Sequence, residues 1–208
     1  MKLRILSLIA FYLVAFFVLF MVVAGVLMMY PKLELHMMLN ACHTGFLDVF
    51  FTYYSMLAEG ALYVLALLPL LWKRKELTIF YAVSEVTAGL VSQILKHVFS
   101  ADRPVVAFEQ CQNMVLPVVE GVHLHHSNSF PSGHASTFFV FFTCCAIFLA
   151  YRYLQCGGGD SRGRRLLFNM TLLVLLALAA LGGYSRVYLS QHFLSDVCAG
   201  SFIGVMTP

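Results

Sequence analysis

Long apolar runs separated by short charged clusters dominate the hydrophobic pattern of this 208-residue chain. A helix needs about 20 apolar residues to cross the hydrocarbon core of a bilayer, and the runs have about this length. The strands of a membrane β-barrel would instead alternate apolar and polar residues over about ten positions at a time. The pattern therefore predicts an all-α integral membrane bundle.

About six transmembrane helices fit into one domain that covers residues 1–208. The expected spans are about 5–29, 51–72, 77–99, 132–154, 166–184 and 192–208. The last is the shortest, near the lower limit for a crossing. Its shortness suggests that the chain is truncated at its C-terminus. Between the first two spans, residues 31–50 carry apolar side chains at helical spacing among polar ones, which predicts a short interfacial helix.

Composition supports the membrane assignment. The chain is 61% hydrophobic and 11% charged, whereas soluble domains have about 25% charged residues. The net charge of +3 does not indicate a nucleic-acid partner, because the basic residues gather at the ends of the apolar runs.

Basic residues also predict the orientation of the bundle. If six spans alternate, the clusters near Arg4, at 73–75 and at 152–165 all fall on one side. The positive-inside rule makes that side cytoplasmic. Residues 31–50, 100–130 and 185–191 then lie on the opposite side.

Three polar stretches lie at that opposite face and contain the candidate chemistry. They are KHVFSADRP at 96–104, SFPSGHAS at 129–136 and SRVYLSQHFLSD at 185–196. Lys96 and Arg103 are seven residues apart, nearly two helical turns, so both are expected on one face of a helix that Pro104 ends. With Arg186, they predict a site for an anion.

The third stretch predicts a nucleophile. His192 and Asp196 have the i, i+4 spacing of neighbours on a helix. The carboxylate is expected to accept a hydrogen bond from one imidazole nitrogen, which leaves the other nitrogen free to attack.

The second stretch predicts a helix start that faces the same anion. Ser132 is a favourable N-cap residue. The N–H groups of the first helical turn attract anions such as phosphate, and Gly133 allows a close backbone approach. His134 is placed to donate a proton. Together the three stretches predict phosphoryl transfer: the cations hold the phosphoryl oxygens, His192 attacks phosphorus, and His134 protonates the leaving oxygen.

The same three stretches resemble the signature of the type-2 phosphatidic acid phosphatase superfamily, K-x6-R-P, P-S-G-H and S-R-x5-H-x3-D, and every position is filled in order. The resemblance implies a membrane phosphatase with six helices, a motif-bearing core at 96–196, a site at the outer face and a phosphohistidine intermediate. It implies three catalytic residues, His134, His192 and Asp196, and five phosphate-binding residues, Lys96, Arg103, Ser132, Gly133 and Arg186, with no metal and no cofactor.

The resemblance leaves the lipid open. Phosphatidic acid, phosphatidylglycerophosphate, undecaprenyl diphosphate and lipid A phosphate are all substrates within the family. Small size and tight loops suggest a bacterial inner membrane protein whose site faces the periplasm. Two other functions remain: a lipid-to-lipid phosphotransferase that uses the same site, and a non-catalytic protein that binds anionic lipid.

Several polar residues outside the motifs have a simpler interpretation. His123, His125 and His126 could suggest a metal, but no cysteine or carboxylate spacing supports one. His36, His43 and Asp48 are expected to be interfacial, whereas Glu59 and Glu85 fall within spans and should face the bundle interior. The sequence fixes neither the oligomeric state nor whether Cys42 and Cys111 form a disulfide.

Overall fold

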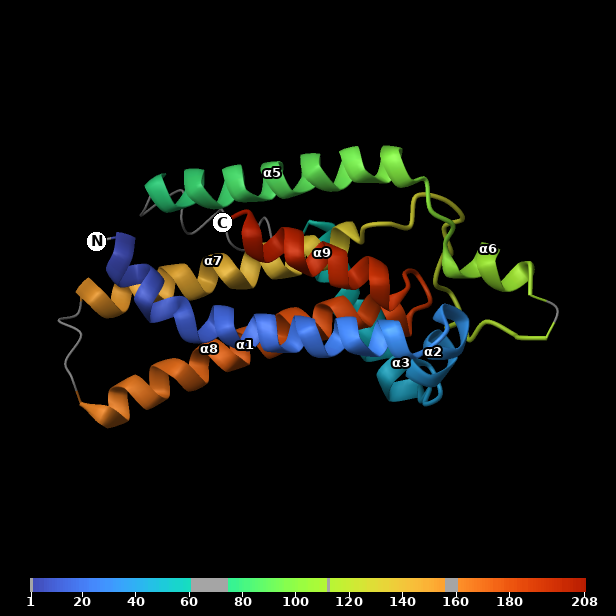
Figure 1. Cartoon of the computed structure of the whole chain (residues 1–208), viewed down its shortest axis with the longest axis horizontal. Coiled ribbons are helices and arrows are strands. Elements are labelled where there is room, and N and C mark those ends of the chain that lie inside the picture. The colour runs from blue at the N-terminus through green and yellow to red at the C-terminus, as the bar shows by residue number, and fades with distance from the viewer. Residues whose placement is uncertain (1, 61–74, 112, 156–160) are drawn as a thin grey trace.

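The computed structural model describes residues 2–60, 75–111, 113–155 and 161–208, and within them the chain is helical without strands. Figure 1 shows the arrangement of the elements. The helices are α1 Lys2–Met29, α2 Lys32–Leu39, α3 Gly45–Met56, the short 3-10 helix η1 Leu57–Glu59, α5 Lys75–Phe99, α6 Pro104–Glu109, α7 Gly133–Gln155, α8 Arg162–Tyr188 and α9 Leu194–Met206.

Among the described residues, four stretches are long and apolar enough to cross a membrane: α1, α5 with α6, α7 and α8. They confirm the spans predicted at 5–29, 77–99, 132–154 and 166–184. The span predicted at 51–72 lies mostly outside the described residues. α9 is apolar but has only 13 residues, so the number of six spans is not established.

The interfacial segment is divided into two helices. α2 follows α1 after Pro31, as predicted, but helical structure stops after Leu39. α3 then begins at Gly45, where the side chain of Thr44 accepts a hydrogen bond from the Leu47 N–H at 3.2 Å. This N-cap ends the irregular turn, so the single helix expected over 31–50 was wrong in its second half.

α7 is the central helix of the bundle. It runs between α5 on one side and α1 and α8 on the other (Figure 1) and contacts all three as well as α9. Its aromatic residues Phe138 and Phe139 are almost fully buried. The start of α7 is therefore held from several directions.

α9 approaches α7 until their backbones touch. A Cβ atom built on Gly200 would collide with the carbonyl oxygen of Ser132, and one on Gly204 would lie 2.5 Å from the carbonyl oxygen of Ser136. Small residues four apart are a common means of close helix packing in membranes. This spacing brings the beginning of α9 against the first turns of α7.

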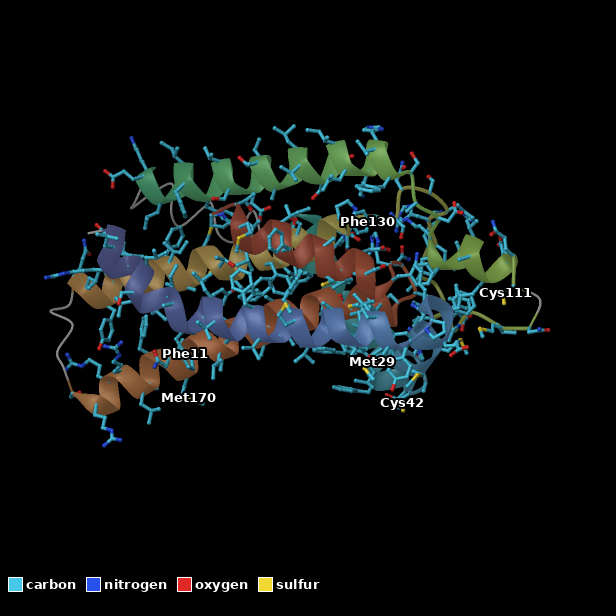
Figure 2. The ribbon with its side chains drawn as sticks, in the orientation of Figure 1. Phe11, Met29, Cys42, Cys111, Phe130 and Met170 are labelled. Atoms are coloured by element: carbon cyan, nitrogen blue, oxygen red, sulfur yellow. The ribbon has the colours of Figure 1, made fainter. Side chains whose placement is uncertain are left out.

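The outer surface of the bundle is apolar. Phe11 and Met29 on α1 and Met170 on α8, labelled in Figure 2, are 41%, 75% and 51% exposed. Helices that face lipid need such surfaces, because their backbone groups bond internally and their side chains contact acyl chains.

The described basic residues of the predicted cytoplasmic side lie at one end of the bundle. Figure 1 places the N-terminus, the start of α5, the end of α7 and the start of α8 at that end. α2, α6 and the turn between α8 and α9 lie towards the other end. The three motif stretches are thus separated from the basic clusters by the length of the helices.

Replacing Gly200 by alanine should weaken the contact between α7 and α9. The added methyl group meets the carbonyl of Ser132, and overpacking of this kind costs about 1–3 kcal/mol. We expect a lower thermal unfolding midpoint in detergent micelles. Gly25→Ala in α1 is the control, because a Cβ there meets nothing within 4 Å; equal midpoints for the two variants would contradict the packing argument.

Candidate active site

The three motif stretches meet where α5 ends, α7 begins and α8 turns into α9. Direct contacts join the stretches. Among them, the Arg103 guanidinium lies 3.5 Å from Nε2 of His192, and the Ser132 N–H donates to the Asp196 carbonyl at 2.9 Å. Lys96, Arg186 and His134 interact electrostatically with this group. The structure therefore brings all the predicted site residues into one region.

His192 is buried, at 1% exposure, in the turn between α8 and α9. Its Nδ1 atom faces Asp196 Oδ2 at 3.6 Å, and its Nε2 atom faces Arg103. α9 begins only at Leu194, so the helical i, i+4 geometry that the sequence suggested is wrong, although the pairing itself is present. Nε2 is the nitrogen that remains available for attack.

Asp196 is fixed by more than the histidine. Its Oδ2 atom accepts hydrogen bonds from the Ser129 hydroxyl at 2.6 Å and from the Phe193 N–H at 3.0 Å. The second bond places the carboxylate in the first turn of α9, where the helix dipole favours negative charge. Ser129 was not predicted as a site residue, although it begins the SFPSGHAS stretch.

Arg103 reaches the site from a loop and not from a helix. α5 ends at Phe99, and Arg103 is extended immediately before α6. Its Nε and Nη1 atoms donate to the carbonyls of Ser127 at 2.9 Å and Gln191 at 3.0 Å. The prediction that Lys96 and Arg103 share one face of a helix ended by Pro104 was therefore wrong, since α5 ends at Phe99 and Pro104 begins α6. The loop still places Arg103 beside His192.

Arg186 is 6% exposed and only partly engaged. Its Nη1 atom donates to the hydroxyl of Ser55 on α3, while its Nε atom has no hydrogen-bond partner among the described residues. Buried polar groups are nearly always bonded. An unsatisfied N–H on a buried cation indicates that an acceptor occupies this place when the site is filled.

Neither buried arginine forms an ion pair with a carboxylate in the described part of the chain. The ion pairs found there all involve histidine, and none joins a carboxylate to Arg103 or Arg186. Burying a cation without a partner is costly. The site is therefore suited to an anionic ligand that supplies the missing charge.

The start of α7 presents two unused N–H groups. The Ser132 hydroxyl accepts a hydrogen bond from the Ala135 N–H at 3.4 Å, as an N-cap should. The backbone N–H of Ser132 donates to the Asp196 carbonyl. Within the described residues, no hydrogen bond engages the N–H of Gly133 or His134. A Cβ on Gly133 would meet open space. Gly133 and His134 fit an anion at the helix start, whereas contact from Ser132 stays a prediction.

His134 lies at the edge of the site and has a partner that the sequence did not indicate. Its Nε2 atom is 3.4 Å from Oε1 of Glu59, the last residue of η1. Glu59 was expected to face the bundle interior, but 55% of its side chain is exposed. No local pattern pairs residues 75 positions apart, so only the fold reveals this contact.

His36 was predicted to be interfacial and is instead buried at 2% exposure. Its Nε2 atom lies 3.2 Å from the hydroxyl of Ser190, which in turn donates to the Pro117 carbonyl. The neighbouring Asn40 amide donates to the Val187 carbonyl at 3.1 Å. α2 therefore braces the turn that carries His192.

Burial controls the protonation of two of these histidines. Removal from water lowers the pKa of His192 to about 4, and the nearby arginines act in the same direction. Burial likewise lowers the pKa of His36 to about 4. Both imidazoles are neutral near neutral pH, and neutrality is the state that a nitrogen nucleophile needs.

The described residues contain no group of three potential metal ligands. His123 and His125 lie with their rings 5.1 Å apart, but no third ligand joins them in the described part of the chain. Cys42 and Cys111 are free thiols, and Figure 2 shows them on different parts of the chain, beyond α2 and beyond α6.

The arrangement can bind a tetrahedral oxyanion and attack it. Arg103 contacts His192 Nε2, Arg186 acts on the same imidazole electrostatically, and Gly133 and His134 line a cavity together with Lys96. These are the parts that phosphoryl transfer requires: charge stabilisation, a positioned nucleophile and an acid.

Comparisons with known proteins agree with this chemistry. The model of the PAP2 superfamily matches residues 77–207. The putative undecaprenyl-diphosphatase YbjG of Escherichia coli (strain K12) is 29% identical over 151 residues, which cover 69% of this chain and 61% of the relative.

Two solved structures share the fold. LpxE of Aquifex aeolicus superposes with a TM-score of 0.62 at 25% identity, covering 86% of this chain and 93% of that one. A PAP2-type phosphatidylglycerolphosphate phosphatase of Bacillus subtilis gives a TM-score of 0.64 at 22% identity, with coverages of 92% and 90%. The latter likeness concerns the fold alone.

The buried state of His192 should make the protein less stable in mild acid. The unfolded chain takes up a proton near pH 6.5, but folded His192 does so only near about 4. The free energy of unfolding therefore falls as the pH falls through this window, by about 1.4 kcal/mol at about pH 5.5. Between about pH 7.5 and 5.5, the thermal unfolding midpoint should fall further in the wild type than in His192→Asn. Equal losses would contradict the assignment.

Proposed function

The chain belongs to the PAP2 superfamily, and from this premise we propose that it is an integral membrane phosphatase that hydrolyses a lipid phosphate monoester or diphosphate through a phosphohistidine intermediate. Membership confirms the family that the three motifs predicted. The observation that carries the proposal is the buried Nε2 atom of His192, which faces Arg103 in a site with two buried arginines and no described carboxylate paired to them.

The first half-reaction forms a covalent bond to His192. Its neutral Nε2 atom attacks phosphorus while Asp196 holds the ring from Nδ1. The bond from phosphorus to the lipid oxygen breaks, its electron pair stays with that oxygen, and His134 supplies a proton to it. Lys96, Arg103 and Arg186 stabilise the charge on the equatorial oxygens, together with the Gly133 and His134 amides.

The second half-reaction releases inorganic phosphate. A water molecule takes the place of the departed lipid, and His134, now neutral, accepts one of its protons. The water oxygen bonds to phosphorus as the N–P bond breaks, and His192 regains its lone pair. The charge needed for both steps comes from this chain's own cations and helix start.

The lipid class remains broader than a single substrate. The Escherichia coli relative is named as a putative undecaprenyl-diphosphatase. The two solved structures are LpxE and a phosphatidylglycerolphosphate phosphatase. The chain spans 61% of the length of the Escherichia coli relative. We therefore propose a bacterial lipid phosphate or polyprenyl diphosphate.

The proposed site faces the outer side of a bacterial inner membrane. The described basic residues at the starts of α1, α5 and α8 and at the end of α7 lie at the end of the bundle away from the site. The positive-inside rule assigns that end to the cytoplasm, which supports a periplasmic site that lipid reaches sideways from the bilayer.

Replacing His192 by alanine should abolish phosphate release, because it removes the imidazole nitrogen that lies 3.5 Å from the Arg103 guanidinium. The measurement is phosphate release in detergent micelles from phosphatidic acid, phosphatidylglycerophosphate, undecaprenyl diphosphate and lipid A. His97→Ala, an exposed histidine near the end of α5, is the control and should retain activity. Full activity in His192→Ala would refute the nucleophile; wild-type transfer of phosphate only to added acceptor lipid would indicate a phosphotransferase.

Chelation of metals should leave turnover unchanged. The cations and the α7 amides supply the charge that a metal would otherwise provide. Activity is measured before and after EDTA treatment, followed by addition of Mg²⁺, Mn²⁺ or Zn²⁺. A strong loss that one of these metals restores would refute the metal-independent mechanism and direct attention to His123 and His125.

A further inference from the structure

We propose that Glu59 is a positioning residue for the reaction: its carboxylate pairs with His134 and holds that imidazole as the proton donor to the leaving oxygen. The inference rests on the proposed function, in which His134 is the general acid. Glu59 lies outside the three motifs and before the matched residues 77–207, so family membership gives it no role.

The geometry places the two side chains in direct contact. Oε1 of Glu59 lies 3.4 Å from Nε2 of His134. Glu59 ends η1, and the next residue, Gly60, has a φ of 135°, a backbone conformation that favours glycine. The turn at Gly60 thus ends the helix with the carboxylate at the site. Ala58, the preceding residue, lines with His134 a cavity of about 140 Å³ between α5, α7 and η1.

The charges around His134 explain why it needs such a partner. Lys96 from α5, Arg103 from the loop before α6, Arg186 from α8 and His192 all act on it electrostatically. The cations that bind phosphate also disfavour the protonated, positively charged form of His134. Glu85 of α5 lines the same cavity and accepts a hydrogen bond from Tyr81, but Glu59 is the described carboxylate in contact with the imidazole.

A second contact shows that the α3–η1 segment belongs to the site. Ser55, four residues before Glu59, is buried and accepts the hydrogen bond from Arg186 Nη1. One short segment therefore contacts both a phosphate-binding cation and the general acid. Movement of this segment would disturb both groups together.

The contact also selects the tautomer of His134. With Nε2–H donated to Glu59, the proton given to the leaving oxygen comes from Nδ1. His134 is then neutral, keeps Nε2–H bonded to Glu59, and has its lone pair on Nδ1. That atom takes the proton of the attacking water in the second half-reaction. Glu59 thus acts on His134 as Asp196 acts on His192.

The test compares Glu59→Gln with the wild type over a range of pH. Glutamine keeps the shape of the side chain and removes its charge. We expect the alkaline limb of the kcat profile to move to lower pH by about one unit, with about a tenfold loss of kcat on that limb. KM should change little, because the phosphate-binding residues are intact. Glu120→Gln, an exposed carboxylate in the loop before α7, should behave as wild type.

A second measurement does not depend on turnover. In ¹⁵N-histidine-labelled protein in micelles, the signal that disappears in His134→Ala is followed as a function of pH. It should titrate at lower pH in Glu59→Gln and be unchanged in Glu120→Gln. A shift without phosphate release from any lipid would refute the proposed function and leave the pair standing. Activity with an unmoved profile and an unmoved titration would overturn the role of Glu59.

Discussion

The backbone contact between the start of α7 and α9 is the constraint on which the site depends. The Ser132 N–H donates to the Asp196 carbonyl, and Gly200 lets the two helices approach until their backbones touch. His134 belongs to the first of these helices, and His192 is held by the second through Asp196. In lipid, no hydrophobic force draws helices together, so close packing of small residues must fix their separation. The distance between the two histidines is therefore a property of helix packing.

The charges in the site are arranged so that the positive charge of the two buried arginines is not neutralised by a paired carboxylate among the described residues. Arg103 donates to carbonyl oxygens and Arg186 to a hydroxyl, groups that orient a guanidinium without neutralising it. Asp196, in contrast, is saturated by Ser129, Phe193 and His192. Within the described residues no carboxylate pairs with either arginine, so in the proposed mechanism the phosphate supplies the opposite charge. The proposal thus assigns attraction for the substrate and orientation of the nucleophile to different residues.

The sequence predicted those features that depend on local pattern. Apolar runs of a membrane thickness located α1, α5, α7 and α8, and the spacing within three motifs identified the residues that the fold brings together. The errors concern contacts between distant positions and the points where helices begin and end. His36 looked interfacial but supports Ser190, and Glu59 looked internal but meets His134. The His192–Asp196 pair was foreseen, but the predicted helical geometry was wrong, because α9 begins at Leu194 and leaves His192 in the preceding turn. Such features follow from how the helices pack, and the periodicity of the sequence does not predict them.

The brace between α2 and the turn that carries His192 has a consequence for the modularity of the protein. His36 and Asn40 bond to Ser190 and to the Val187 carbonyl, yet both precede the segment that carries every motif. A shortened version that began at residue 77 would contain the complete signature and still lack the contacts that hold the turn with His192, the proposed nucleophile. Chimeras between relatives should accordingly exchange α2 and the 189–193 turn as one unit, because the two segments contact each other. The amino-terminal third therefore takes part in building the site as well as in anchoring the chain in the bilayer.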